Sequence, residues 1–253
     1  MLSGKRALVT AASAGLGRAC AEKLAAYGCR VAICGREQAA LHEAAASIGA
    51  AAIPADLARA EDVVHLVETA CSLLGGLDIL VVNAGHVAYG DLESLSDREW
   101  EHAFQMLVMG AVRLVRTALP HLRAAGGGSI VFIGSASVRS PPPHLLLSSV
   151  MRLGVAGLAK TLATGLAKDR VRVNVVAPGY FGTGRVRNRV EARKKDGVSE
   201  DQAVREIAGA IPAGRLGRAE ELAEMVAFLA SDRCGFLTGA HLPIDGGATG
   251  FPL

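Results

Sequence analysis

A glycine-bearing turn near the start of the chain is the first place where residue types and spacing could do chemistry. The stretch from Thr10 to Gly17 reads TAASAGLG and joins an apolar segment to a helical one. Glycines there would let a phosphate approach backbone N–H groups at the helix N-terminus, where the helix dipole favours an anion. Small-residue turns after strands are common, so this segment alone indicates an anion site without identifying the ligand.

An arginine follows the second apolar segment, at a position that can select between nucleotides. In a nucleotide-binding βαβ unit, an acidic residue there accepts hydrogen bonds from the ribose 2′-OH of NAD. This chain has Gly35-Arg36 instead, and a guanidinium can pair with a 2′-phosphate through a fork of donors. We therefore expect NADP(H), with Arg18 as a second cation. The alternative, a surface arginine at a helix start, suits Arg18 better than Arg36.

Alternating apolar and amphipathic segments predict the scaffold that must position these groups. Short apolar runs predict strands, and longer segments with apolar residues at helical spacing predict helices. The expected strands are 6–10, 30–34, 51–54, 77–82, 129–133, 171–176 and 241–244; the expected helices are 15–27, 37–48, 60–74, 97–122, from after Pro143 to about 168, and 220–230. This alternation predicts an α/β fold, a single Rossmann-type doubly wound parallel sheet with helices on both faces.

We expect one domain over residues 1–253, because no linker or compositional break divides the chain. One stretch departs from the alternation: residues 184–216 are rich in charge and follow the carboxyl end of a strand. That position suits a lid over a ligand, and the alternative is a solvated surface helix.

Composition excludes several classes of protein. Apolar residues make up 51% of the 253 residues and charged residues 20%, which argues against disorder. A net charge of +3 is too balanced to favour nucleic acid or an anionic membrane as partner, and no apolar run is expected to span a membrane. Five scattered cysteines predict free thiols and no metal site, and with the lack of a signal peptide they indicate a cytoplasmic protein.

Five short motifs in order resemble those of the short-chain dehydrogenase/reductase family, in particular members similar to 3-oxoacyl-acyl carrier protein reductases. The segment 10–17 resembles the family's T-G-x-x-x-G-x-G turn. The others are Asp56-Leu57, Asn83-Ala84-Gly85, Pro178-Gly179 with Thr183, and Asp245-Gly246-Gly247. The resemblance covers nearly the whole chain and implies the doubly wound fold and a nicotinamide cofactor.

The resemblance also implies which residues bind that cofactor. Asp56 and Leu57 would lie against the adenine, and Thr183 at the nicotinamide end. The other expected contacts are Thr10, Ser13, Gly15, Leu16, Gly17, Arg36, Asn83, Ala84, Gly85, Arg152, Pro178 and Gly179. Ala11 replaces the first glycine of the family turn, a change that is tolerable if its φ is negative.

Three of the family's four catalytic positions are replaced in this sequence. Family members move a hydride between nicotinamide and a carbonyl or carbinol carbon. A serine binds the oxygen, a tyrosine transfers the proton, a lysine assists the tyrosine, and an asparagine supports a relay water. The serine is kept as Ser135, whereas Ser148, Arg152 and Leu107 stand at the other positions. A serine hydroxyl is a poor acid, and an arginine cannot give up its proton.

Substitute groups would come from neighbouring residues. Arg152 could still hold the ribose hydroxyls, and Ser148 could hydrogen-bond a substrate oxygen. His144 is the first candidate for the proton donor, because an imidazole titrates near pH 6.5. His86 and Tyr180 flank the same cleft, and for all three an ordinary loop residue is the alternative.

Three functions stay open. The leading one is an NADP(H)-dependent oxidoreductase with a remodelled site, acting on a small carbonyl or alcohol substrate. The alternative is a catalytically weak or inactive NADP(H)-binding sensor or oligomer partner, and the third is a lyase- or isomerase-type reaction on the same fold. Apolar surface beyond one stripe on the helices at 97–122 and after 143 predicts a homotetramer, with a dimer as fallback.

Overall fold

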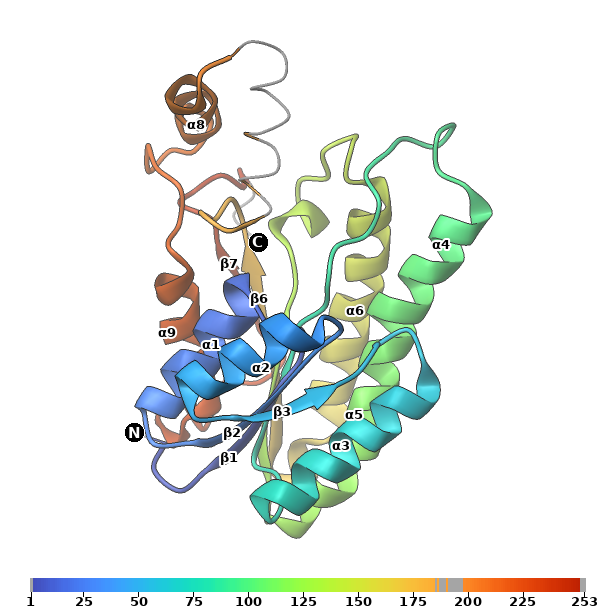
Figure 1. Cartoon of the computed structure of the whole chain (residues 1–253), viewed down its shortest axis with the longest axis vertical. Coiled ribbons are helices and arrows are strands. Elements are labelled where there is room, and N and C mark those ends of the chain that lie inside the picture. Colours follow the sequence, from blue (N-terminus) through green and yellow to red (C-terminus); the bar gives the residue numbers. More distant parts are fainter. Residues whose placement is uncertain (1, 185, 187–189, 191–197, 251–253) are drawn as a thin grey trace.

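The computed structural model describes residues 2–184, 186, 190 and 198–250 (Figure 1). A sheet of seven parallel strands runs in the order β3-β2-β1-β4-β5-β6-β7. The strands are β1 Arg6–Val9, β2 Arg30–Gly35, β3 Ala51–Pro54, β4 Ile79–Val82, β5 Gly128–Ile133, β6 Val171–Pro178 and β7 His241–Ile244. The predicted doubly wound α/β fold is therefore confirmed. The order reverses between β1 and β4, where such sheets form a ligand crevice at their carboxyl ends.

The central strands are apolar on both faces, because helices cover both. Every residue of β4 is buried. The register sets Val81 beside Val9 of β1 and Val131 of β5. Runs without polar alternation are typical of such doubly covered parallel strands.

Helices form two layers, one on each face of the sheet (Figure 1). One layer contains α1 Gly15–Ala26, α2 Gln38–Ile48 and α9 Ala219–Ala230; the other contains α3 Ala60–Leu74, α5 Gly110–Ala124 and α6 Leu146–Gly165. Alternate strand residues supply the two apolar cores, so that Leu8 packs under one layer and Val9 under the other. Both halves of the chain contribute to each layer.

The helix expected over 97–122 consists of three pieces. It begins with α4 Asp97–Ala103, continues as the π-helical segment η1 Phe104–Met109, and ends as α5. Ser96 caps α4 in a capping box in which its N–H donates to the Glu99 carboxylate at 2.8 Å. Single π-helical turns inside α-helices are rare and are frequent at functional sites.

Other bounds differ from the expected ones by a few residues. The helix expected to reach about 168 ends at Gly165, and the turn η3 Ala167–Asp169 follows it. Arg170 then adopts a left-handed conformation with φ +56°, which ends the helical segment before β6. Strand β6 extends to Pro178, two residues beyond its expected end.

Among the described residues, α6 is the one helix with the length and apolar composition of a membrane span. Within its 20 residues, an 18-residue window has a mean hydropathy of 1.3, and 39% of that window is buried. The expectation that no apolar run approaches a membrane span was therefore wrong on length and composition. Length and composition alone are weak evidence for a membrane span, because a helix in the core of a globular protein meets both criteria. Packing of α6 on β6 and η1 accounts for its buried face.

Much of the expected lid, residues 185, 187–189 and 191–197, lies outside the described residues. After it comes α8 Glu200–Gly209, which stands beyond the carboxyl edge of the sheet in Figure 1. Ala203 and Ile207 of α8 form a separate small apolar cluster with Val186 and Val190. The described part of the stretch is therefore an amphipathic helix with its own small core.

Candidate active site

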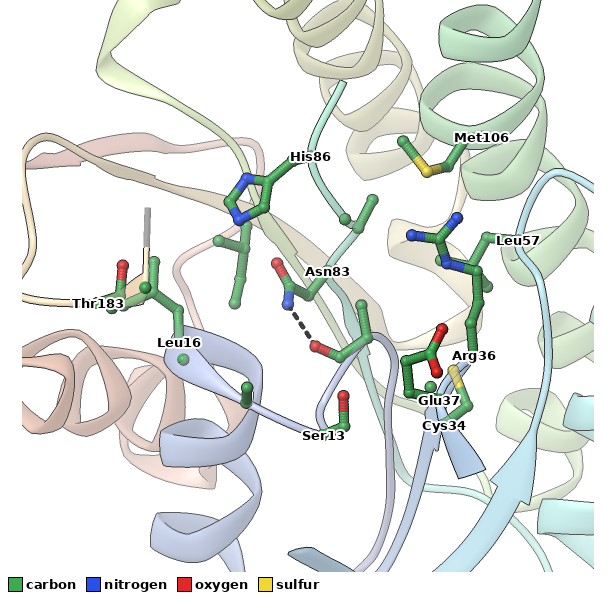
Figure 2. A pocket seen from close by; sticks show the side chains of 18 of the residues that line it. Ser13, Leu16, Cys34, Arg36, Glu37, Leu57, Asn83, His86, Met106 and Thr183 are labelled. Carbon is green, nitrogen blue, oxygen red and sulfur yellow. Dashed lines mark hydrogen bonds between the residues drawn. The ribbon is translucent and has the colours of Figure 1, made fainter. Parts of the chain in front are cut away.

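A cavity of about 310 Å³ lies where the carboxyl ends of strands β1 to β6 meet (Figure 2). Loops after all six strands contribute to its wall, together with Met106 of η1 and Arg152 of α6. Most of the expected cofactor positions line it: Ser13, Gly15, Leu16, Arg36, Asp56, Leu57, Asn83, Ala84, Gly85, Arg152, Pro178 and Thr183. The remaining three, Thr10, Gly17 and Gly179, are not among the lining residues.

Thr10 and Asn83 fasten β1 to β4 next to the cavity. The Thr10 hydroxyl is fully buried; it donates to the Asn83 carbonyl at 2.6 Å and accepts the Asn83 N–H at 2.9 Å. The Asn83 side-chain amide donates to the Ala11 carbonyl at 3.0 Å, the dashed line in Figure 2. These bonds fix the turn after β1 against the end of β4, at the switch point of the sheet.

Close packing explains the glycines that stand behind the wall. A Cβ on Gly17 would lie 2.4 Å from the Ala11 carbonyl oxygen, so only glycine lets α1 approach the turn this closely. A Cβ on Gly179 would lie 2.7 Å from Cβ of Asp245. Gly17 and Gly179 therefore do not line the cavity themselves but allow the segments that form its wall to pack closely.

Ala11 corrects one expectation. Its φ is +45°, in the left-handed region that costs an L-residue roughly 1–2 kcal/mol. The condition stated from the sequence, a negative φ, is not met. The turn has kept the backbone conformation that suits glycine although the residue is alanine.

Arg36 and Glu37 both line the cavity from the turn between β2 and α2 (Figure 2). Both side chains are exposed. A 2′-phosphate would be attracted by Arg36 and repelled by Glu37, whereas a 2′-OH could donate to Glu37. The sequence motif predicts a contact only for Arg36; Glu37, the next residue of the same turn, lines the cavity as well.

Burial keeps Cys34 neutral at this end of the cavity. Its side chain is 1% exposed, and burial raises the pKa of the thiol to about 12. Gly35 follows it, and a Cβ there would lie 3.1 Å from the Ser13 hydroxyl oxygen. The wall beneath Arg36 is thus tightly packed and carries no charge of its own.

Arg152 is fixed by the backbone of β5. Its Nη1 donates to the carbonyl of Ile133 at 2.8 Å and to that of Gly134 at 3.2 Å. All three residues line the cavity. A permanent cation is therefore held at the carboxyl end of β5, at the position where the family has its lysine.

The two serines of the expected catalytic set are buried beside the cavity and are not among its lining residues. The Ser135 hydroxyl oxygen accepts the N–H of Ser137 at 3.2 Å and its O–H at 2.9 Å. Ser148, in the first turn of α6, is 3% exposed. Of the π-helical segment, Met106 lines the cavity, and Leu107 is buried without lining it.

His144 lies on a loop outside the lining residues. Its ring stacks on that of Tyr89, with centroids 6.3 Å apart. The adjacent Gly90 and Leu145 form an isolated parallel bridge, so the loops after β4 and β5 are tied together there. His86, by contrast, lines the cavity itself, as does Thr183, whereas Tyr180 does not.

Figure 2 orders the labelled side chains across the cavity. Arg36 and Leu57 lie on one side of Asn83, and Leu16 and Thr183 lie on the other, with His86 above Asn83 toward the latter side. Fold and site together define a dinucleotide-binding α/β protein of the doubly wound class.

Comparisons with known proteins narrow this class. A family profile described as enoyl-(acyl carrier protein) reductase matches residues 10–249. The chain is 35% identical over 251 residues to dehydrogenase/reductase SDR family member 4 of Caenorhabditis elegans, covering 96% of this chain and 95% of the relative. It is 34% identical over 254 residues to an uncharacterized oxidoreductase of Thermotoga maritima, covering 97% and 98%.

A solved structure agrees over the same length. L-Sorbose reductase from Gluconobacter frateurii, complexed with NADPH and L-sorbose, superposes with a TM-score of 0.95 at 34% identity, covering 99% of this chain and 98% of that one. The chain belongs to the short-chain dehydrogenase/reductase family, as the motifs indicated, and is an oxidoreductase of that family.

Proposed function

We propose that the protein is an NADP(H)-dependent oxidoreductase that acts on a small carbonyl or alcohol substrate. One observation carries the proposal: a single cavity joins the glycine turn after β1, Arg36 after β2 and Arg152 at the end of β5. The complex of the Gluconobacter reductase with NADPH supports a nicotinamide cofactor.

The residues present fit such a cofactor. Gly15, with φ +59°, and Gly17 leave the N-terminus of α1 open to a diphosphate. Arg36 would pair with the 2′-phosphate, and Asp56 with Leu57 would flank the adenine. Thr183 and Arg152 would hold the nicotinamide half.

When bound, the cofactor supplies or takes up a hydride. The chain's own residues must orient the substrate and manage the proton. Arg152 contributes a cation that stays charged at every relevant pH, and it can hold ribose hydroxyls or stabilise negative charge on a substrate oxygen. Ser135 could donate its own O–H to that oxygen, because it is the acceptor in both of its hydrogen bonds with Ser137.

A second function is favoured by the composition of the wall. Among the described lining residues there is no tyrosine and no lysine. Losing a general acid typically costs about 10²–10⁴-fold in rate. A weakly active or inactive NADP(H)-binding sensor or oligomer partner would keep the cofactor-binding residues and lack the catalytic tyrosine and lysine, as this cavity wall does.

Two measurements on the parent protein separate these functions. Fluorescence titration with NADPH and NADH tests the cofactor, and NADPH oxidation with activated carbonyls such as quinones and diketones tests the chemistry. NADPH binding with turnover supports the oxidoreductase, and NADPH binding without turnover supports the sensor. Equal affinities for the two nucleotides would contradict the NADP(H) assignment.

The two charged residues of the turn between β2 and α2, Arg36 and Glu37, allow a sharper test of the choice between NADPH and NADH. Arg36→Asp should weaken NADPH binding by about 10- to 100-fold, because a hydrogen bond to a charged group contributes roughly 1.5–3 kcal/mol. The neighbouring Glu37→Gln should instead tighten NADPH binding a few-fold and weaken NADH binding, and the difference should shrink at high salt. Unchanged NADPH affinity in Arg36→Asp would show that the guanidinium does not contact the nucleotide.

We further propose that residues 1–253 form one domain and that the protein assembles as a homotetramer in the cytoplasm. Its partners would be limited to small molecules and its own copies. The balanced net charge of +3 and the exposed apolar side chains of η1 and α6 support these assignments.

A further inference from the structure

The cavity lacks the family's proton donor but contains other titratable groups. Those among its described lining residues are Cys34, Arg36, Glu37, Asp56, His86 and Arg152. A donor for carbonyl reduction must reach the substrate oxygen and must exchange its proton near neutral pH.

Position and chemistry exclude five of these six. Arg36 and Glu37 belong to the end of the cavity marked by Arg36 and Leu57 in Figure 2, where the adenosine half would lie. Asp56 directly precedes Leu57 and also lines the cavity. The Cys34 thiol is buried with a pKa of about 12, so it keeps its proton at neutral pH. Arg152 cannot release a proton.

We infer that His86 is the catalytic acid–base of the reaction, an inference that rests on the proposed function. His86 directly follows Asn83-Ala84-Gly85, so the fixed end of β4 sets its position. It lines the cavity on the side of Leu16 and Thr183 (Figure 2). Its side chain is exposed, so it can recover a proton from water between turnovers.

The proton balance is simple. As hydride arrives at the carbonyl carbon, the π pair of the C=O bond moves to oxygen, and an N–H bond of the His86 imidazolium breaks to form the O–H bond of the alcohol. The imidazole is left neutral and regains a proton from solvent. In the reverse direction, neutral His86 accepts the hydroxyl proton of the alcohol.

Opposite pH dependences follow for the two directions. Reduction requires the imidazolium, so its kcat/KM falls as pH rises through the His86 pKa. Oxidation requires the neutral ring, so its kcat/KM rises over the same range. The other charged groups of the cavity wall are Arg36, Glu37, Asp56 and Arg152, and Arg152 is held at the carboxyl end of β5.

The test compares His86→Asn with His65→Asn, an exposed histidine of α3 that does not line the cavity. We expect His86→Asn to lower kcat of diketone reduction by about 10²–10⁴-fold and to flatten the near-neutral limb of both pH profiles. His65→Asn should change neither. NADPH affinity, measured by fluorescence titration, confirms that each variant is folded and binds cofactor.

A second readout needs no turnover. NMR titration of the His86 ring should show a lower midpoint with NADP⁺ than with NADPH bound, because the oxidised nicotinamide carries a positive charge. Identical midpoints in the two complexes, or a parent-like pH profile in His86→Asn, would overturn the inference while leaving the proposed function intact. A protein that binds NADPH and reduces no carbonyl overturns it as well, whereas failure to bind NADPH overturns the proposed function itself.

Discussion

The positive φ of Ala11 makes this residue a measurable source of strain. Ala11→Gly removes the Cβ that costs roughly 1–2 kcal/mol at this conformation, offset by roughly 0.4–1 kcal/mol of added freedom in the unfolded chain. We expect a stabilisation of about 0.5–1 kcal/mol, seen as a Tm increase of roughly 1–4 °C. The neighbouring Ala12→Gly, at a fully buried position with negative φ, should lower Tm. A decrease of equal size in both variants would show that the turn is unstrained.

Ser148 and Arg152 can be tested as a pair. Ser148→Tyr alone places a phenol beside an arginine that is held on the carbonyls of Ile133 and Gly134. The double variant Ser148→Tyr with Arg152→Lys restores both family residues and should raise reduction of a simple, unactivated ketone by about 10²-fold or more. Steady-state NADPH oxidation measures this, with each single variant as control. A double variant no faster than the parent would show that these positions are not the ones that limit the reaction.

An ion pair at the amino ends of the strands joins β1 to β4. Arg6 donates through Nε to Asp78 at 2.7 Å and through Nη2 at 3.0 Å, and the Arg6 N–H adds a bond of 2.8 Å. Burial alone would raise the pKa of Asp78, but the hydrogen bonds and charge of Arg6 hold it below its usual value of 3.8. The side chains are only 23% and 14% exposed, so the pair is shielded from solvent.

Asp78→Asn should lower the free energy of unfolding by about 1–3 kcal/mol at pH 7. Because the folded-state pKa is depressed, the carboxylate's contribution is present above pH 3.8 and is lost as pH falls through the folded pKa. Urea unfolding of parent and variant should therefore differ by a constant amount from pH 7 to about 5, and the difference should shrink only as pH falls below 3.8 toward the folded pKa. Asp232→Asn, at the 89% exposed partner of Lys5, should have little effect at any pH.

Element types were predictable, and several atomic details were not. The strand ends were marked by motifs such as Asn83-Ala84-Gly85, and parallel strands bring their carboxyl ends to one edge, so most cofactor positions could be predicted to meet. The π-helical turn at Phe104–Met109 and the φ of Ala11 could not, since both depend on packing against distant segments. The hydrogen bonds of Ser135 to Ser137 could not be predicted for a different reason, since they depend on the detailed geometry of a local turn.

At the scale of the whole molecule, exposed apolar side chains favour assembly. Phe104 of η1 and Val150 and Leu153 of α6 are 43%, 47% and 58% exposed, which is more than an isolated α/β unit needs to leave in water. We expect a tetramer, with a dimer as fallback, and Leu153→Glu should lower the mass measured by light scattering at micromolar concentration. Leu73→Glu, at an equally exposed leucine of α3, should not. A monomeric parent would contradict this assembly.

The π-helical turn also bears on how the chain can gain and lose residues during evolution. A π turn holds one more residue than an α turn. Deleting one residue between Phe104 and Met109 would let the segment close as α-helix while α4 and α5 keep their present faces toward the sheet. A deletion within α5 would instead rotate one part of the helix against the other by roughly 100°. Insertions and deletions among related chains should therefore be concentrated at this turn. Because Met106 of this turn lines the cavity, deletion of a single residue there would reshape the cavity wall without unfolding the protein.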